Sequence, residues 1–356
     1  MARESAPVLE HPWPDNPEHG AVTTIAPGVL WLRMPLELTG LNHINLWLLE
    51  DGDGWTVVDT GMNAAALRSI WEATFDTAMQ GRPVRRVICT HYHPDHMGLA
   101  GWLCDRFDAE LWVTKQEWLT GRMFQLDGQR QAEAPEHHME HFRRIGFNSQ
   151  AMTLLRERGF GHYAEHVSPI PPRFRRIRDR EILSIGGHDW QVIVGTGHAP
   201  EHACLWSASR GLMISGDQVL PRITPHIGVY PNEPEANPLR DYIDSLDNYR
   251  HLPADTLVLP AHGLPFRGLH KRLDYLAHHH DTRLIQLVEL LAEPKRVMST
   301  FRVLFGRQLN PFEIFLACGE ALAHLNLLIA DGRVVRRLDE NGVWVFERST
   351  ARADAA

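Results

Sequence analysis

One stretch decides how this 356-residue chain is interpreted, and it reads Thr90-His91-Tyr92-His93-Pro94-Asp95-His96. It follows an apolar run typical of a buried strand and precedes a helical pattern. Side chains two apart in an extended chain point the same way, so we expect His91 and His93 to chelate one ion. Asp95 and His96 follow where the chain turns into the helix, and we expect them to face a second ion. Four ligand-type residues within six positions predict a metal site.

Three later positions share one pattern, in which a ligand-type residue lies just past a predicted strand and beside a glycine. They are His198, Asp217 and His262. Glycine at such a point lets backbone approach closely. We expect these three residues to complete a centre of two divalent metal ions. Histidine and carboxylate ligands suit zinc, which is the first choice, and they also suit iron or manganese.

Around these motifs, short apolar runs bounded by Gly, Pro and Asp turn signals predict strands. The strands are expected at residues 22–25, 29–34, 44–49, 55–58, 84–90, 110–113, 181–194, 203–208, 211–216 and 256–259. Helices are expected at 63–79, 97–107, 238–250 and 268–292. The mixed order predicts an α/β protein, in which an irregular arm (1–20) precedes one large catalytic domain (21–292).

Two segments depart from this alternation. Residues 115–180 are mostly helical in pattern and rich in Arg, His and aromatic residues, so we interpret them as a helical insertion or lid. Residues 293–356 predict helices followed by a two-stranded ribbon, which is a small winged-helix pattern. Residues 295–356 contain nine Lys or Arg and seven Asp or Glu, a net charge of about +2 that is weak for a nucleic-acid reader. We interpret this tail as a packing element or a homodimer contact.

The order of the motifs H-x-H-x-D-H, G-H-x-P-x-H, G-D and P-x-H-G resembles the metallo-β-lactamase-fold hydrolases over residues 21–290. The resemblance implies a four-layer αββα sandwich with the metals at one edge. The ligand set that it implies is His91, His93 and His198 for the first metal, Asp95, His96 and His262 for the second, and Asp217 as the bridge. It also implies that Asp59 orients the histidine loop and that His202 supports the ligands.

The tail resembles the winged-helix extension of one branch of that family, similar to β-lactamase-like protein 2 and glyoxalase II. Members of the branch include thioesterase-like hydrolases and an endoribonuclease. The leading hypothesis is a hydrolase of a small acyl substrate, which is a thioester, an ester or a lactone. Two metals about 3.5–4 Å apart would share a hydroxide that attacks the acyl carbon. Asp95 would orient this hydroxide and accept its proton, and His202 would steady the oxyanion.

Three alternatives stay open: a metal-dependent endoribonuclease, a mononuclear-iron sulfur dioxygenase and a ligand-binding sensor with a catalytically inactive hydrolase fold. Oxygen-reducing di-iron relatives typically carry Glu at the position of His93, which argues against that redox branch. The net charge of −8 argues against a general polyanion binder, so nucleic acid is not the expected partner. Four cysteines without a C-x-x-C pair, no visible secretory signal and no long apolar run predict a cytoplasmic protein without a membrane span.

We interpret the remaining histidine and arginine clusters as surface features without a binding role. The runs 137–138 and 278–280 look like solvated helix faces, although the chain holds 22 histidines. His137 and His141 have zinc-compatible spacing, but isolated pairs of this kind are usually solvated. The basic run 171–180 is interpreted as a strand edge blunted by charge rather than as a phosphate grip.

Overall fold

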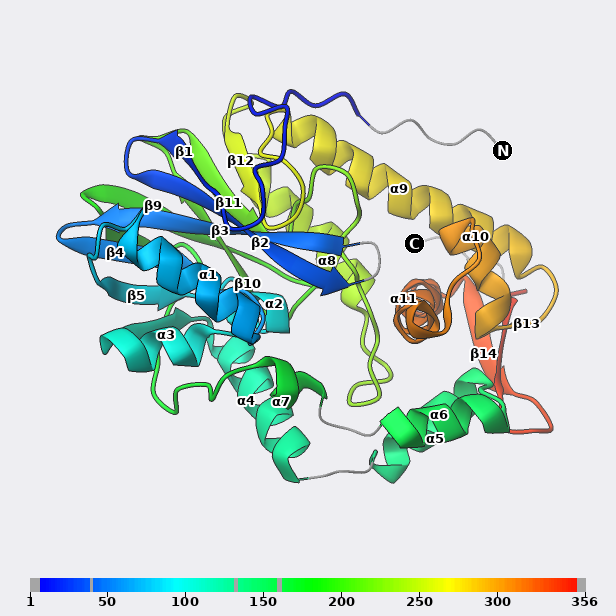
Figure 1. The fold of residues 1–356 in the computed structure, drawn as a ribbon. Coiled ribbons are helices and arrows are strands. Elements are labelled where there is room, and N and C mark those ends of the chain that lie inside the picture. The colour runs from blue at the N-terminus through cyan, green and yellow to red at the C-terminus, as the bar shows by residue number, and fades with distance from the viewer. Residues whose placement is uncertain (1–6, 39–40, 131–133, 159–161, 351–356) are drawn as a thin grey trace. The chain divides into compact units, whose positions relative to one another are not determined.

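The computed structural model describes residues 7–38, 41–130, 134–158 and 162–350 (Figure 1). The chain divides into two compact units, neither of which is continuous in sequence. The first unit comprises Met1–Arg130, Gly161–Pro225 and Asp247–Leu273, and the second comprises Gln131–Phe160, His226–Leu246 and Asp274–Ala356. The boundary expected at residues 292/293 falls within the second unit, because the last segment of that unit already begins at Asp274.

Two β-sheets form the first unit. The larger sheet has the strand order β1-β2-β3-β4-β5-β6-β7 and comprises β1 (Val22–Ala26), β2 (Val29–Leu38), β3 (Leu41–Asp51), β4 (Gly54–Val58), β5 (Val84–Ile88), β6 (Glu110–Val113) and β7 (Arg175–Arg176). The other sheet has the order β12-β11-β10-β9-β8 and comprises β8 (Ile182–Ile185), β9 (His188–Gly195), β10 (His202–Ser207), β11 (Leu212–Gly216) and β12 (Leu257–Pro260). Strands β4 to β7 pair in parallel, and so do β11 and β12.

The core of the first unit lies on both faces of the larger sheet. Side chains alternate between faces along a strand, so Trp47 joins Trp190 of the smaller sheet in one buried cluster. The neighbouring Leu48 joins a second cluster, which contains Trp71 of α1 (Ala65–Asp76) and Leu103 of α3 (Ala100–Phe107). Figure 1 shows these two helices along the larger sheet. Helix, sheet and sheet are thus three layers of the predicted α/β sandwich, and its fourth layer stays a prediction.

The stretch 115–180, expected to form one helical insertion, is divided between the two units. Helices α4 (Lys115–Arg130) and α7 (His162–His166) belong to the first unit, whereas α5 (Glu136–Ile145) and α6 (Ser149–Arg158) belong to the second. Within the second unit, His141 of α5 contacts Trp344 and Phe142 contacts Phe315. The stretch is therefore shared between two compact units, and its role as a lid stays a prediction.

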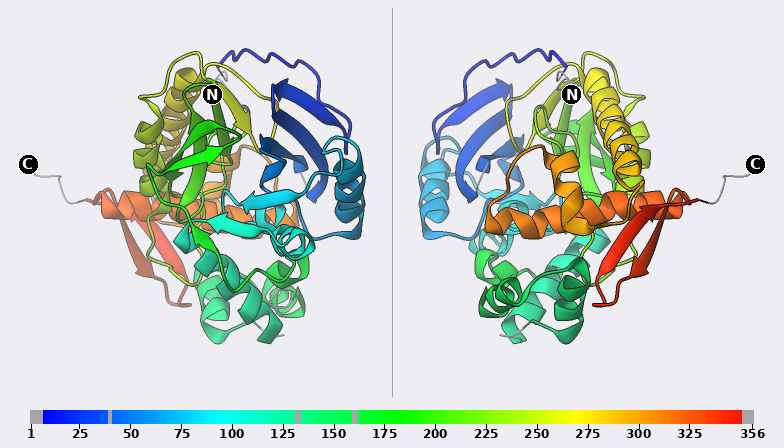
Figure 2. Two further views of the ribbon diagram at one scale, coloured as in Figure 1. Left: turned by 90° about the vertical axis from the view of Figure 1, so that its left-hand side faces the viewer. Right: turned by 90° about the vertical axis from the view of Figure 1, so that its right-hand side faces the viewer.

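The second unit combines helices with a small sheet. It contains α8 (Pro238–Ser245), most of α9 (Leu269–Leu290), η2 (Val297–Thr300), α10 (Phe301–Phe305) and α11 (Pro311–Ala330), and a sheet in the order β13-β15-β14 made of β13 (Lys295–Arg296), β14 (Val334–Leu338) and β15 (Trp344–Arg348). The red hairpin β14–β15 lies beside the orange helix α11 (Figures 1 and 2). The predicted ribbon is confirmed and gains a third strand, and the winged-helix assignment stays a prediction.

Helix α11 is also the one described segment that passes a length and composition test for crossing a membrane. The passing window is Glu313–Ala330, and 61% of it is buried inside the protein. Burial of this extent is what the core helix of a folded unit shows. The expectation that the chain has no membrane span therefore stays a prediction.

Two sequence interpretations of charged clusters have different outcomes. The histidine runs are not simply solvated, because His138 and His280 are buried. The Nε2 atom of His138 lies 2.9 Å from Asn232 Oδ1, and the Nδ1 atom of His280 lies 3.3 Å from His324 Nε2. The basic run does form a strand edge, because its β7 is the last strand of the larger sheet.

Candidate metal centre

The seven predicted ligands come together in the first unit because each follows the end of a strand. In chain order they are His91 and His93 after β5, Asp95 and His96 on the short helix α2 (Pro94–Met97), His198 after β9, Asp217 after β11 and His262 after β12. Six of them are buried, and His93 is partly exposed. The side chains form two adjacent groups of potential ligands.

The first group consists of His91, His93, His198 and Asp217, with the facing atoms all within 4.8 Å of one another. The Nε2 atom of His91 lies 2.8 Å from His93 Nδ1 and 3.2 Å from His198 Nε2. The Nε2 atom of His198 lies 3.4 Å from Asp217 Oδ2. Three imidazole nitrogens and a carboxylate oxygen around one point match the donor set of a zinc-type site.

The second group consists of Asp95, His96 and His262, again with the facing atoms within 4.8 Å. The Oδ2 atom of Asp95 lies 3.5 Å from His96 Nε2 and 3.4 Å from His262 Nε2. His96 Nδ1 donates to Asp59 Oδ2 at 2.8 Å, and His262 Nδ1 donates to the carbonyl oxygen of His43 at 2.7 Å. With the proton fixed on Nδ1, each ring turns the lone pair of Nε2 toward the group.

Asp217 belongs to both groups through its two oxygens. Its Oδ2 atom faces His198, whereas its Oδ1 atom lies 3.5 Å from His96 Nε2 and 3.3 Å from His262 Nε2. One carboxylate therefore presents one oxygen to each group. This is the geometry expected of a bridging ligand.

Three buried atoms of the centre lack a hydrogen-bond partner among the described residues. They are His96 Nε2, Asp217 Oδ1 and His262 Nε2. Leaving one buried polar atom unpaired costs about 1–3 kcal/mol, so three at one point are a large cost. A divalent cation would satisfy all three at once, and the donor set fits such an ion.

The electrostatics of the second group also call for positive charge. Burial lowers the pKa of His262, but the carboxylates of Asp217 and Asp95 outweigh it and raise the pKa to about 10. Burial likewise lowers the pKa of His96, and nearby carboxylates, Asp59 foremost, hold it well above the usual value. These carboxylates therefore make positive charge favourable at this point. A bound metal ion would take over that charge.

Comparison with known proteins agrees with this geometry. Residues 39–262 match the Metallo-beta-lactamase superfamily. The chain belongs to that superfamily. Residues 284–349 match a second family, described as the metallo-beta-lactamase-like C-terminal domain.

Three proteins are similar to this chain over most of its length. A beta-lactamase domain protein from Burkholderia ambifaria has 42% identity and a TM-score of 0.89, covering 96% of this chain and 98% of that one. A metallo-beta-lactamase family protein from Thermus thermophilus has 28% identity and a TM-score of 0.76, covering 92% and 100%. A probable metallo-hydrolase of Bacillus subtilis, YqjP, is 25% identical over 333 residues, covering 89% and 97%.

Within this metallo-beta-lactamase fold, Asp59 holds the histidine loop as predicted. Its Oδ1 atom accepts the backbone N–H of Thr90 at 2.8 Å, and its Oδ2 atom accepts the Thr90 hydroxyl at 2.8 Å as well as His96 Nδ1. Asp59 adopts a left-handed backbone conformation with φ of 61°. Such a strained conformation in a non-glycine residue costs about 1–3 kcal/mol and is typical of functional sites.

A buried asparagine fixes the loop that carries His262. The Nδ2 atom of Asn45 donates to the carbonyl oxygens of Pro260 and Gly263 at 2.9 and 2.7 Å, and its Oδ1 accepts the indole N–H of Trp31 at 2.8 Å. Sequence reasoning missed this role. The available signal was a polar residue inside an apolar strand.

Two residues of the divided insertion support the histidine loop, and sequence reasoning missed both. The Oε2 atom of Glu117 on α4 accepts the backbone N–H of Tyr92 at 2.9 Å, and its Oε1 atom accepts that of Glu201 at 2.7 Å. Tyr163 on α7 donates its hydroxyl to the carbonyl oxygen of Tyr92 at 2.6 Å. Glu117 is fully buried, and burial raises its pKa to about 8. Its position in the first turn of a helix gave no distinctive signal, because acidic residues are common there.

His202 lies where it can hold the candidate ligand Asp217 in place. It is fully buried, and its Nε2 atom accepts the backbone N–H of Asp217 at 3.1 Å. A β-carbon on Gly216 would lie 2.5 Å from that same atom, so glycine permits the close approach. The oxyanion role expected for His202 stays a prediction.

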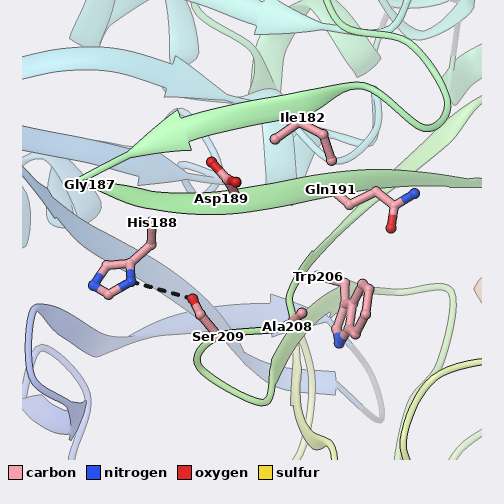
Figure 3. Close-up of a pocket in the computed structure, with 8 residues that line it drawn as sticks. All are labelled: Ile182, Gly187, His188, Asp189, Gln191, Trp206, Ala208 and Ser209. Carbon is pink, nitrogen blue, oxygen red and sulfur yellow. Dashed lines mark hydrogen bonds between the residues drawn. The ribbon is translucent and has the colours of Figure 1, made fainter.

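A separate open pocket of about 500 Å³ lies on the smaller sheet (Figure 3). Its lining includes His188 and Asp189 at the start of β9 and Trp206 near the end of β10. The predicted ligand His198 instead follows the end of β9. This pocket therefore lies at the opposite end of the strands and contains none of the predicted ligands.

Proposed function

We propose that this chain is a metal-dependent hydrolase that uses two divalent ions on a small acyl substrate, which is a thioester, an ester or a lactone. The observation that carries the proposal is Asp217, whose two oxygens face two separate ligand groups. The chain's membership of the superfamily and its similarity to a probable metallo-hydrolase support hydrolysis as the reaction class.

Zinc is the proposed metal because most of the candidate ligands are histidine nitrogens. Iron and manganese suit the same residues. Two bound ions would lower the pKa of a shared water and polarise the carbonyl oxygen of the substrate. Burial raises the pKa of Asp95, but His96 and His262 outweigh this and lower it to about 2. Asp95 is therefore ionised at neutral pH. It can accept a hydrogen bond from the attacking water and take its proton.

We propose a positioning role for His202. It fixes the backbone of Asp217 through the contact between Nε2 and the amide N–H. Burial and the neighbouring His198 keep the pKa of His202 well below its usual value, so the ring remains neutral and accepts this hydrogen bond.

The endoribonuclease alternative requires a basic groove for the phosphate backbone. In the basic run, Arg175 pairs with Glu181, and Arg180 lies 3.4 Å from Asp179. With Glu201, which lies 3.9 Å from Arg176, carboxylates pair with three of the five arginines of the run. This pairing favours a small substrate over RNA.

The proposal also includes the branch that has a winged-helix extension. The support is the hairpin β14–β15 beside α11 and the match of residues 284–349 to a C-terminal domain of this superfamily. The proposed location is the cytoplasm, and the proposed role of the tail is packing or homodimer formation.

The test is a panel of thioesters, lactones, phosphodiesters and RNA assayed with metal-loaded protein. We expect turnover of acyl substrates and little cleavage of RNA. The variant Asp95→Asn should lower kcat/KM by about 10²–10⁴-fold, because it cannot accept the proton of the water. Asp189→Asn, in the distant pocket of Figure 3, is the matched control and should retain the wild-type rate. An unchanged rate in Asp95→Asn, or cleavage of RNA alone, would overturn the proposal.

A further inference from the structure

A second pocket of the first unit borders the candidate metal centre. It has a volume of about 390 Å³ and is lined by residues of the arm, the start of β3 and the loops that follow β11 and β12. His262 belongs to both the pocket lining and the second ligand group. Small-molecule sites typically have volumes of about 300–1,000 Å³, so this pocket suits a compact ligand.

Hydrogen bonds of His43 and His11 fix two walls of this pocket. The Nε2 atom of His43 accepts the backbone N–H of Gly263 at 2.9 Å, and its Nδ1 atom donates to Asn42 Oδ1 at 2.8 Å. On the other side, His11 Nδ1 lies 3.0 Å from the carbonyl oxygen of Pro265.

A buried arginine holds the loop after β11. Arg272 is fully buried and donates its Nε–H to the carbonyl oxygen of Leu220 and a terminal N–H to that of Ile223, both at 2.6 Å. Between these two anchor points lies Arg222, whose side chain is exposed and lines the pocket. The backbone of Arg222 is therefore fixed while its guanidinium group remains available.

The charge of the lining is one-sided. Arg222 is its one arginine or lysine, and the described lining contains no aspartate or glutamate. No carboxylate among the described residues forms an ion pair with Arg222, in contrast to the paired Arg175. Leu41, Ile223 and Leu264 add apolar surface. A pocket with apolar walls and one available guanidinium fits an apolar chain that ends in a single negative charge.

We infer that this pocket selects acyl substrates that carry a carboxylate, and that Arg222 is the residue that recognises it. The inference rests on the proposed function, because it places the reacting acyl group toward His262. A carboxylate suits the planar guanidinium fork, since two parallel N–H groups can bind its two oxygens. A phosphate dianion would call for further arginine or lysine side chains, and the described lining contains none besides Arg222.

The binding test uses metal-free protein, because a metal ion would itself bind carboxylates. Glutarate and its neutral diamide, glutaramide, are titrated and followed by calorimetry or NMR. We expect glutarate to bind more tightly than glutaramide, and Arg222→Gln to weaken glutarate about tenfold. Arg222→Lys keeps the positive charge but lacks the two parallel N–H groups, so its affinity for glutarate should lie between those of wild type and Arg222→Gln. Arg180→Gln, an exposed arginine outside the pocket, is the matched control and should change nothing.

The turnover test uses metal-loaded protein and two thioesters that differ in one end, glutaryl and pentanoyl. Arg222→Gln should raise KM about tenfold for the glutaryl compound, leave kcat unchanged and leave both constants for the pentanoyl compound unchanged. Equal binding of glutarate by wild type and Arg222→Gln would overturn the inference. Inorganic phosphate that binds through Arg222 while glutarate does not would overturn the carboxylate assignment. Absence of turnover with both thioesters would instead count against the proposed function, and the binding test would still decide the role of Arg222.

Discussion

Both units contain buried histidines, but their surroundings differ. In the first unit, His96 and His262 face the carboxylates of Asp95 and Asp217. In the second unit, His280 faces His324, and ring contacts dominate around it. Burial lowers the pKa of His280 well below its usual value, whereas carboxylates hold that of His96 well above it. Burial of histidine is therefore not the mark of a metal site. The mark is convergence with carboxylates that require a cation.

The largest effect should come from removing the carboxylate that joins the two ligand groups. Asp217→Asn keeps the shape of the side chain but removes its negative charge, so the protein should lose at least one metal ion and about 10²–10³-fold in kcat/KM. Metal analysis and steady-state kinetics measure both effects. The matched change in the second unit is His280→Gln, which should leave metal content unaltered. Retained metal and retained activity in Asp217→Asn would contradict the claim that carboxylates distinguish the metal site from the buried histidines of the second unit.

The next effect is the pH dependence of the stability of the second unit. Burial lowers the pKa of His141 to about 4, below its unfolded value of 6.5. The unfolded chain therefore binds a proton that the folded unit excludes, and stability should fall as the pH drops from about 6.5 to 4. The expected loss is about 3 kcal/mol, since one unit of pKa corresponds to ~1.4 kcal/mol. Hydrogen exchange in α5 and β15 measures it.

The controls for this pH effect lie on the same helix. His141→Gln removes the titrating ring and should flatten the pH dependence of exchange in α5, whereas the exposed His137→Gln should not. An unchanged pH dependence in His141→Gln would show that another group is responsible.

The smallest of these effects should come from a residue that supports the ligands without touching the metal. Glu117→Gln replaces one acceptor oxygen with an N–H donor, which cannot accept the backbone N–H of Tyr92 or Glu201. Loss of such supporting contacts typically weakens metal binding about 10–100-fold. Competition with a chelator measures the affinity, and the exposed Glu110→Gln is the control. Equal affinity in Glu117→Gln and wild type would limit this residue to a structural role.

Sequence reasoning identified the candidate ligands because their order along the chain carries the information. His91, His93, Asp95 and His96 lie within six residues, and the three remaining candidates each follow a recognisable apolar strand. The mixed α/β fold followed from the same short runs, and most strands lie within one or two residues of their expected places.

Long-range contacts were out of reach of such reasoning. Glu117 and Tyr92 are 25 positions apart, and the Asn45 contacts with the His262 loop span more than 200 positions. The division of residues 115–180 between two units was missed for the same reason. The amphipathic pattern of α5 reveals that it has a buried face but not which unit covers that face.

The most direct measurement of the central claim is the number of metal ions per chain. Purified protein is saturated with zinc, freed of excess metal and analysed by native mass spectrometry together with elemental analysis. The account predicts two ions per wild-type chain, because Asp217 presents one oxygen to each ligand group. A saturated chain that holds only one ion, or none, would contradict it.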